Sequence, residues 1–310
     1  MPASPARTRR LLIALAVVVV AALAAVVLVV VRPWEGAASD ASTGRSAPAT
    51  GPAGRTTGTP RAGSTYLALG DSVPFGFRAN ETAAYPQAGN FTGYPELVAR
   101  DLGLTVLNAS CPGETTASFS DTSARAFGCE NSPQSATAGY RTVYPLHVRY
   151  PLPQSQLDYA VTTLRATPGV GLVTIQLGAN DAFLCRDTTG DQCAGEGPSV
   201  VATAQHNLEA ILSALRTRGR YTGRIVVVTY YALDYTGLAG ASTQYLDGAL
   251  TGAAQAHGAE VASGYDAFQP AAQKAGGNAI TAGLILPGDV HPTASGQRLL
   301  ATAVEDVLRR

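Results

Sequence analysis

Four short polar clusters contain the residue types that acyl-transfer chemistry requires. They are GDS with Ser72, SCPGETT with Gly113, GAND with Asn180, and GDVHPT with Asp289 and His291. A serine hydroxyl is a poor nucleophile until a neighbouring base, most often histidine, takes its proton. The base needs an acceptor that orients it, and the transition state needs hydrogen-bond donors for the oxyanion that develops. The four clusters together offer all of these groups.

Each of these residues therefore receives a candidate role. Ser72 is the candidate nucleophile, His291 the candidate general base, and Asp289 the acid that orients the base. The backbone amides of Ser72 and Gly113 and the side-chain amide of Asn180 are the candidate oxyanion hole, in which each donor lowers the barrier by roughly 3 to 4 kcal/mol. Taken singly, each cluster also fits a simple turn or the start of a helix.

Five segments have the near-continuous apolar character of strands that are covered on both faces. They are TYLALG (65–70), LTVLNA (104–109), GLVTIQLG (171–178), RIVVVTYY (224–231) and, less regularly, AEVASGY (259–265). Helical patterns lie between them, near 94–103, 154–166, 199–218 and 240–257, and from 293 to the end. This alternation predicts a three-layer α/β/α domain with a parallel sheet of about five strands.

The predicted sheet also places the four clusters. In open parallel sheets, sites form outside the carboxyl ends of the strands. The first three clusters follow the first three predicted strands, and GDVHPT precedes the last helix, so we expect them to meet at one edge. Among the four histidines only His291 belongs to such a loop, and we expect structural or solvent-exposed roles for His147, His206 and His257.

The N-terminal part of the chain has a different composition. Residues 11–31 are an unbroken apolar run behind three arginines, and as a helix this run would span roughly 30 Å, the thickness of a hydrocarbon core. We predict a cytoplasmic basic segment at 1–10, a transmembrane signal anchor at 11–31, and a flexible Ala/Gly/Ser/Thr/Pro-rich linker at 32–63. The catalytic domain, 64–310, would then be extracytoplasmic on a single-pass cell-membrane protein. Secretion after cleavage near 36–38 is the alternative.

Composition and cysteine content indicate which kinds of ligand and bond the protein has. The chain has 22 basic and 22 acidic residues, so it has no electrostatic footprint for nucleic acid. Four cysteines, Cys111, Cys129, Cys185 and Cys193, all lie in the predicted outer domain, where an even number indicates disulfides. Three pairings are possible. Pairing of sequence neighbours would close two local loops, each worth roughly 2.5 to 3 kcal/mol. No Cys-x-x-Cys or paired-histidine spacing supports a metal site, and we expect no metal and no organic cofactor.

From residue 64 to 310 the sequence resembles the GDSL, or SGNH, hydrolase superfamily, particularly the secreted and membrane-attached esterases of actinobacteria. The resemblance rests on GDS at 70–72, Gly113 of SCPGETT, GAND at 178–181 and HPT at 291–293. It implies a flavodoxin-like sheet, Ser72 as nucleophile and His291 as base. It also implies an oxyanion hole made by Ser72, Gly113 and Asn180.

One position departs from the family pattern. The family usually has its acid three residues before the histidine, where this chain has Gly288, and the nearest aspartate is Asp289. Either Asp289 reaches the imidazole, or a backbone carbonyl near Gly288 orients it. The resemblance leaves both arrangements open.

The predicted function is a serine ester hydrolase that cleaves short or medium acyl esters through an acyl-enzyme on Ser72. An acyltransferase, or a carbohydrate acetylesterase acting on envelope glycans or lipids, would use the same acyl-enzyme, and a non-catalytic envelope binding protein is the alternative from another class. We expect a monomer whose partners are an ester substrate and, through the N-terminal helix, the membrane. Two Tyr-bearing stretches, 140–153 and 229–237, are expected to flank the site.

Overall fold

A five-stranded parallel sheet forms the centre of the protein. The computed structural model describes residues 58–310, and its strands lie in the order β2-β1-β3-β4-β5. The strands are β1 (Thr65–Gly70), β2 (Thr105–Asn108), β3 (Val170–Gln176), β4 (Arg224–Val228) and β5 (Glu260–Ala262), and every neighbouring pair is parallel. This is the flavodoxin-like order, in which the direction of winding reverses between β1 and β3. The predicted five-stranded parallel sheet is confirmed.

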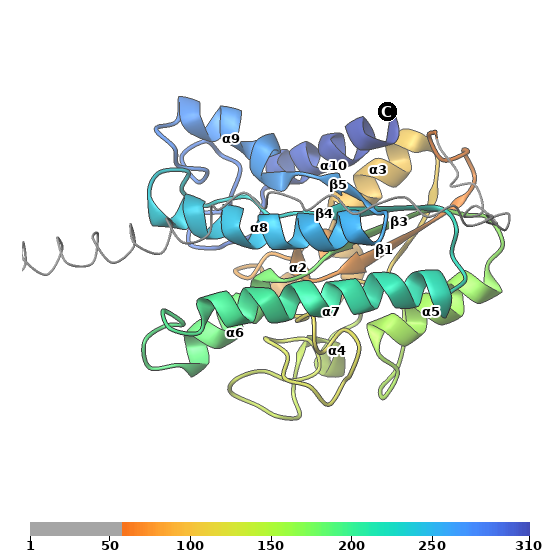
Figure 1. Ribbon diagram of the computed structural model, residues 1–310, viewed down its shortest axis with the longest axis horizontal. Helices are drawn as coiled ribbons and strands as arrows, with labels where there is room; N and C mark the ends of the chain where they lie inside the picture. The colour runs from red at the N-terminus through yellow and green to blue at the C-terminus, as the bar shows by residue number, and fades with distance from the viewer. Residues whose placement is uncertain (1–57) are drawn as a thin grey trace, which may run out of the picture. The chain divides into compact units, whose positions relative to one another are not determined.

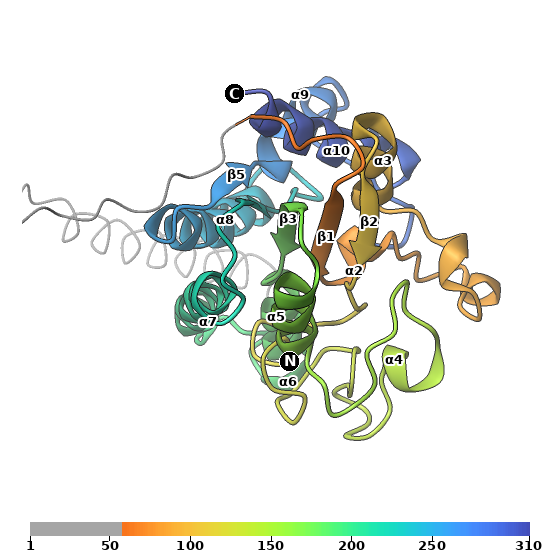
Figure 2. The same cartoon turned by 90° about the vertical axis from the view of Figure 1, so that its right-hand side faces the viewer.

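Helices cover both faces of the sheet (Figures 1 and 2). One layer consists of α3 (Tyr94–Leu102), α9 (Gly264–Lys274) and α10 (Ala294–Leu308), and the other of α5 (Gln156–Ala166), α7 (Gly197–Thr217) and α8 (Leu238–Ala256). Shorter helices lie at the sheet edge or in the long loop after β2: α2 (Ser72–Phe75), η1 (Thr82–Ala84), η2 (Ala88–Asn90), α4 (Tyr140–Val143) and α6 (Ala179–Thr188). Because helices cover both faces, the strands can be apolar throughout.

The core accordingly lies between the sheet and its two helix layers. Leu67, Leu69, Leu172 and Ile175 are fully buried side chains of the central strands. Two buried hydroxyls of these strands satisfy each other, because those of Tyr66 and Thr174 lie 2.7 Å apart. The core therefore contributes hydrophobic stabilisation without an unpaired polar group at this point.

Two helices differ from the sequence-based expectation. α6 begins at Ala179, so GAND forms the start of a helix rather than a loop that follows a strand. The pattern at 259–265 gives only the short strand β5, and Gly264 already belongs to α9, which carries Pro270 in its interior. An interior proline removes a helical hydrogen bond, which is why the sequence here did not favour a helix.

The two ends of the described chain meet at the amino-terminal edge of the sheet. Arg224, the first residue of β4, donates from Nη1 to the carbonyls of Gly58 and Leu308, at 2.9 and 2.8 Å. It also donates from Nη2 to the carbonyl of Val307 and pairs with Glu260 at the start of β5. This buried guanidinium fastens residue 58 and the end of α10 to the same point.

The predicted cytoplasmic segment (1–10), the transmembrane anchor (11–31) and most of the linker (32–63) lie outside the described residues. Within 58–310, no helix is long and apolar enough to cross a membrane.

Candidate active site

Ser72 lies at the carboxyl end of β1, on a sharp turn into α2. Gly70 has φ +136°, and a Cβ there would lie 2.2 Å from the carbonyl oxygen of Gln176 on the neighbouring strand, so only glycine fits. The carboxylate of Asp71 caps α2 by accepting the amide of Val73 at 2.9 Å. Ser72 is therefore the first residue of a capped helix, and 9% of it is exposed.

His291 is held by Asp289. Nδ1 of His291 lies 2.5 Å from Oδ1 of Asp289, and the other oxygen of this carboxylate accepts the amide of Ala79 at 2.9 Å. Burial by itself would raise the pKa of Asp289, but the hydrogen bond and charge of His291 and the amides of Ala79 and Val290 together lower this pKa to about 2. The carboxylate is thus ionised at neutral pH, which fixes the proton of the neutral imidazole on Nδ1 and leaves Nε2 free to accept one.

The contact between Asp289 and His291 distinguishes the two arrangements that the sequence left open for orienting the imidazole. The partner of Nδ1 is the carboxylate of Asp289, and not a backbone carbonyl near Gly288. The ring of Phe77 stands edge-on to the imidazole, with centroids 5.2 Å apart. The imidazole is therefore oriented by the acid two residues before it and is packed against an aromatic wall.

Asn180 and the Gly113 loop meet beside the nucleophile turn. Asn180 lies in the first turn of α6, and its Nδ2 donates to the carbonyl of Glu114 at 3.0 Å. The next residue, Asp181, accepts both the amide and the hydroxyl of Thr116, at 3.0 and 2.6 Å. Gly113 has φ +83°, and a Cβ there would lie 2.5 Å from the backbone of Gly128, so the loop requires glycine. These contacts fix the loop 113–116 on the start of α6.

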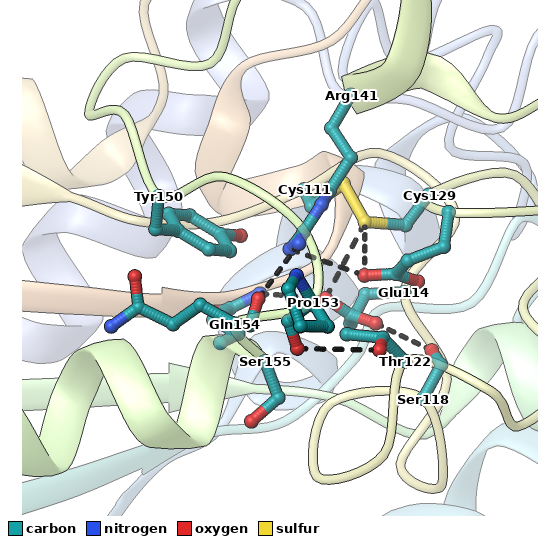
Figure 3. A network of polar contacts seen from close by, with 12 residues as sticks. Cys111, Glu114, Ser118, Thr122, Cys129, Arg141, Tyr150, Pro153, Gln154 and Ser155 are labelled. Atoms are coloured by element: carbon teal, nitrogen blue, oxygen red, sulfur yellow. Dashed lines mark hydrogen bonds and ion pairs between the residues drawn. A yellow bond between two sulfur atoms is a disulfide. The ribbon is translucent and has the colours of Figure 1, made fainter.

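A buried polar network connects the loop 113–116 to the end of β1 and the start of α5 (Figure 3). Gln156, the first residue of α5, accepts the amide of Gly70 at 2.6 Å and donates to the carbonyl of Gly70 at 3.0 Å. Its Nε2 also donates to Oε2 of Glu114 at 3.0 Å, and the hydroxyl of Ser118 donates to Oε1 of the same carboxyl group. Glu114 therefore connects the Gly113 loop to the end of β1, directly before Ser72.

The charges of this network do not balance unless one carboxyl group carries a proton. Glu114 and Glu130 lie beside a single cation, Arg141, whose Nη1 is 3.3 Å from Oε1 of Glu130, and all three side chains are buried. Burial, followed by the charge of Glu130, raises the pKa of Glu114 well above its usual value. Burial also raises the pKa of Glu130, and the charge of Arg141 reduces this rise. We infer that Glu114 is the protonated carboxyl group, because it is Glu130 that forms the ion pair with Arg141.

Asp71 connects the nucleophile turn to the strand-four loop. Its Oδ2 accepts the hydroxyl of Tyr230 at 2.5 Å and lies 3.4 Å from Nδ2 of Asn180. Burial raises the pKa of Asp71 to about 6, against the lowering effect of the hydrogen bonds from Tyr230 and the amide of Val73. Three loops that follow β1, β3 and β4 are thus joined by one carboxyl group.

Ser72 and His291 line the same cavity, which has a volume of about 890 Å³. Asp71, Asn180, Tyr230 and Tyr231 line it as well. The cavity thus brings together three of the four polar clusters, GDS, GAND and GDVHPT, and the loop that follows β4. Gly113 itself does not reach the cavity wall and is placed by the bond between Asn180 and the carbonyl of Glu114. The arrangement brings a hydroxyl, an oriented imidazole and an amide together at one edge of the sheet.

The two Tyr-bearing stretches have different positions. The stretch 229–237 contributes Tyr230, Tyr231 and Leu233 to the cavity, whereas none of the described residues that line it comes from 140–153. Tyr140 instead packs against Phe75, with ring centroids 5.4 Å apart, in a small separate core. Of the two stretches only the second lines the cavity, whereas Tyr140 contacts Phe77, the ring that packs against His291.

Sequence reasoning assigned no role to Asp71, Glu114 or Gln156. Asp71 and Glu114 stand next to Ser72 and Gly113 inside the GDS and SCPGETT motifs, so their position in the sequence could have identified them as site residues. Gln156 gave none, because it lies 86 residues from Gly70, and only the fold brings the two together.

The cysteines form the two local disulfides among the three possible pairings, Cys111–Cys129 and Cys185–Cys193. Each pair lies beside a carboxylate, Glu114 in the first group and Glu196 in the second. A disulfide offers no thiolate, which is the form of cysteine that binds metals. These two groups are therefore not candidate metal centres.

Comparisons with known proteins identify the family and support the fold. The sequence model of the GDSL-like lipase/acylhydrolase family matches residues 68–299. No curated protein matches the sequence. Among solved structures, LAE5, an alpha/beta hydrolase enzyme from the metagenome of Lake Arreo in Spain, is 18% identical with a TM-score of 0.50, over 80% of this chain and 96% of that one. Axe2, an acetylxylan esterase from Geobacillus stearothermophilus, is 16% identical with a TM-score of 0.51, over 80% of this chain and 95% of that one. At these identities the likeness shows the fold alone.

Proposed function

Because the chain belongs to the GDSL-like lipase/acylhydrolase family and is a serine ester hydrolase, we propose that Ser72 is its nucleophile and His291 its general base. The observation that carries the proposal is the shared cavity of Ser72 and His291, with the Asp289 carboxylate 2.5 Å from Nδ1 of the imidazole. An imidazole oriented in this way accepts a serine proton on Nε2.

The proposed reaction proceeds through an acyl-enzyme. Oγ of Ser72 attacks the ester carbonyl carbon while Nε2 of His291 takes the hydroxyl proton, and Asp289 stabilises the imidazolium that forms. The amide of Ser72 and Nδ2 of Asn180 stabilise the oxyanion from the cavity wall, and the Gly113 loop holds Asn180 in position. The imidazolium then returns its proton to the leaving alkoxide, and the carbon–oxygen bond to the alcohol breaks.

Water completes the cycle in the second half of the proposed reaction. His291 deprotonates a water molecule, which attacks the acyl carbon. The bond to Oγ of Ser72 then breaks, the imidazolium returns the proton to Oγ, and the acid is released. Transfer to a sugar or lipid hydroxyl would use the same acyl-enzyme. Adding glycerol to the assay and measuring the ratio of free acid to glyceryl ester distinguishes hydrolysis from transfer.

A serine-directed fluorophosphonate probe tests the nucleophile. We expect the folded full chain to be labelled and Ser72→Ala to be unlabelled and inactive on p-nitrophenyl acetate. The matched control is Ser242→Ala, which removes another serine from the wall of the same cavity and should keep the label. Labelling that persists in Ser72→Ala would refute the assignment.

We also propose that the catalytic domain is exported and tethered through residues 11–31. The two disulfides support export, because such bonds persist in oxidising compartments. Protease treatment of intact cells tests this proposal. A tethered outer domain would be degraded while the cytoplasmic proteins remain intact, and complete protection of the domain would contradict it.

A further inference from the structure

The cavity beside Ser72 extends far beyond the space that the reacting groups occupy. It runs from Ser72 between α6, α7 and α8, and away from the catalytic end its walls are mainly aliphatic and aromatic. These side chains include Phe183, Val201, Leu233, Tyr245 and Leu246. Its acidic and basic lining residues are Asp71 and His291 at the catalytic end and Arg186, whose guanidinium lies on the ring of Phe183 at 5.0 Å.

The apolar surface continues to the outside of the molecule. Only four large hydrophobic side chains are exposed among the described residues, and two of them, Leu238 and Tyr245, line this cavity from the first half of α8. An exposed apolar cluster that continues into a deep apolar cavity marks a site for an apolar ligand. An acetyl group on Ser72 would leave most of the 890 Å³ unfilled.

One wall of the cavity is a loop that has little to hold it. Residues 189–196 join α6 to α7, and Gln192, Cys193 and Ala194 of this loop line the cavity. None of the residues 189–196 is buried, so the loop has no core of its own. Its hydrogen bonds are local, such as the amide of Cys193 to the hydroxyl of Thr189 at 2.7 Å. Figure 1 shows the loop at the same end of the molecule as the start of α8.

The backbone of this loop is also in an unfavourable conformation. Gln192 and Cys193 are consecutive residues with φ of 58° and 68°, in the left-handed region that residues other than glycine rarely adopt. The disulfide from Cys193 to the buried Cys185 of α6 is the covalent bond that keeps the loop in place. Without this bond, the unburied loop would leave its strained conformation, and the cavity would lose that wall.

From these observations we propose that the cavity holds the acyl chain of a medium- or long-chain ester, and that the Cys185–Cys193 disulfide determines chain-length selectivity by holding the loop wall in place. The proposal rests on the proposed function, since it concerns the acyl group that is transferred to Ser72. Cys185, Cys193 and the loop are positioning elements here, not catalytic residues.

The first test measures kcat/KM of the full chain on p-nitrophenyl acetate and decanoate, each below its critical micelle concentration. Each buried methylene is worth up to about fourfold in this ratio, so we expect decanoate to exceed acetate by at least about a hundredfold. Equal rates, or a preference for acetate, would overturn the proposal. If neither ester is cleaved and the fluorophosphonate does not label Ser72, the proposed function fails instead, so the two failures are distinguishable.

The second test changes the loop wall. In the double variant Cys185→Ser with Cys193→Ser we expect the decanoate-to-acetate ratio to fall by at least about tenfold, the equivalent of about two buried methylenes. Because this variant can fail to fold, Ala194→Trp provides a second measurement. It keeps the disulfide, fills the cavity from the loop side, and should lower the same ratio by a similar factor.

Ala202→Trp is the matched control for the added indole ring. Ala202 lies on the exposed side of α7, does not line the cavity, and should leave the ratio unchanged. If the folded cysteine double variant and Ala194→Trp both keep the wild-type ratio within about threefold, the loop does not set selectivity and the proposal is wrong. A cysteine double variant that does not fold leaves the decision to Ala194→Trp.

Discussion

In the variant Asp289→Asn, an amide replaces the carboxylate that lies 2.5 Å from Nδ1 of His291. The pKa of Asp289, about 2 against an ordinary 3.8, corresponds to roughly 2 kcal/mol of stabilisation of its ionised form. Burial opposes this stabilisation, and the hydrogen bond and charge of His291 contribute most to it. A hydrogen bond to a charged group contributes about 1.5 to 3 kcal/mol, which is a factor of about 10 to 150 in rate. The amide also permits the wrong imidazole tautomer, a change that has cost about ten-thousandfold in a serine protease triad. We therefore expect kcat to fall by about a thousandfold to ten-thousandfold.

The assay is kcat on p-nitrophenyl acetate at neutral pH, after thermal unfolding has shown that the variant is folded. This check is needed because a carboxylate with a lowered pKa stabilises the fold above its ordinary pKa and loses that contribution as the pH falls from about 4 to 2. At pH 7 the variant should thus be less stable by about 2 kcal/mol. Asp306→Asn, which changes an exposed aspartate of α10, is the matched control and should change kcat by less than about twofold. A loss of less than about tenfold in Asp289→Asn would refute the reasoning and favour another acceptor for Nδ1.

Three further predictions concern the donors and the buried acids. Asn180→Ala should lower kcat by about a hundredfold to a thousandfold with little change in KM, measured on p-nitrophenyl acetate, because an oxyanion donor is lost. Glu114→Gln should remain folded and active, since its amide oxygen can accept from Gln156 as the protonated acid does. Glu114→Leu should be less stable by about 1 to 3 kcal/mol in urea denaturation, because the buried donor of Gln156 loses its acceptor. Burial raises the pKa of Asp247 to about 7, so the stability of the wild type should decline as the pH rises from about 4 to 7. Asp247→Asn, which can still accept the amide of Tyr230, should show a smaller decline in urea denaturation at pH 5 and pH 8, and an unchanged decline would contradict the assignment.

The sequence predicted the sheet well, because its information is local. The strand β1 has the predicted bounds, and β2, β3 and β4 lie within or one residue beyond their apolar runs. Strands buried on both faces must be apolar along their whole length, so composition alone identifies them. The convergence of Ser72, Asn180 and His291 then follows from the parallel topology, in which the carboxyl ends of all strands share one edge.

What the sequence did not predict depends on contacts between distant segments. The acceptor for His291 was left open between Asp289 and a backbone carbonyl, because loop geometry decides which of them reaches Nδ1. Gln156 escaped notice since a glutamine at the start of a helix carries no chemical signature. The sequence predicted a disulfide at Cys193 but not that 189–196 forms a cavity wall, because these residues are mostly small or polar and none is buried, and only their position in the fold gives them this role.

The hold of Arg224 on both ends of the described chain has a practical consequence. Its Nη1 donates to the carbonyls of Gly58 and Leu308, so these two atoms are neighbours at the sheet edge opposite Ser72. A short peptide bridge could therefore join the two ends, and new termini could be opened in an exposed surface turn to give a circular permutant. The same edge suits attachment to a solid support, since a linker there would leave the substrate entrance unobstructed.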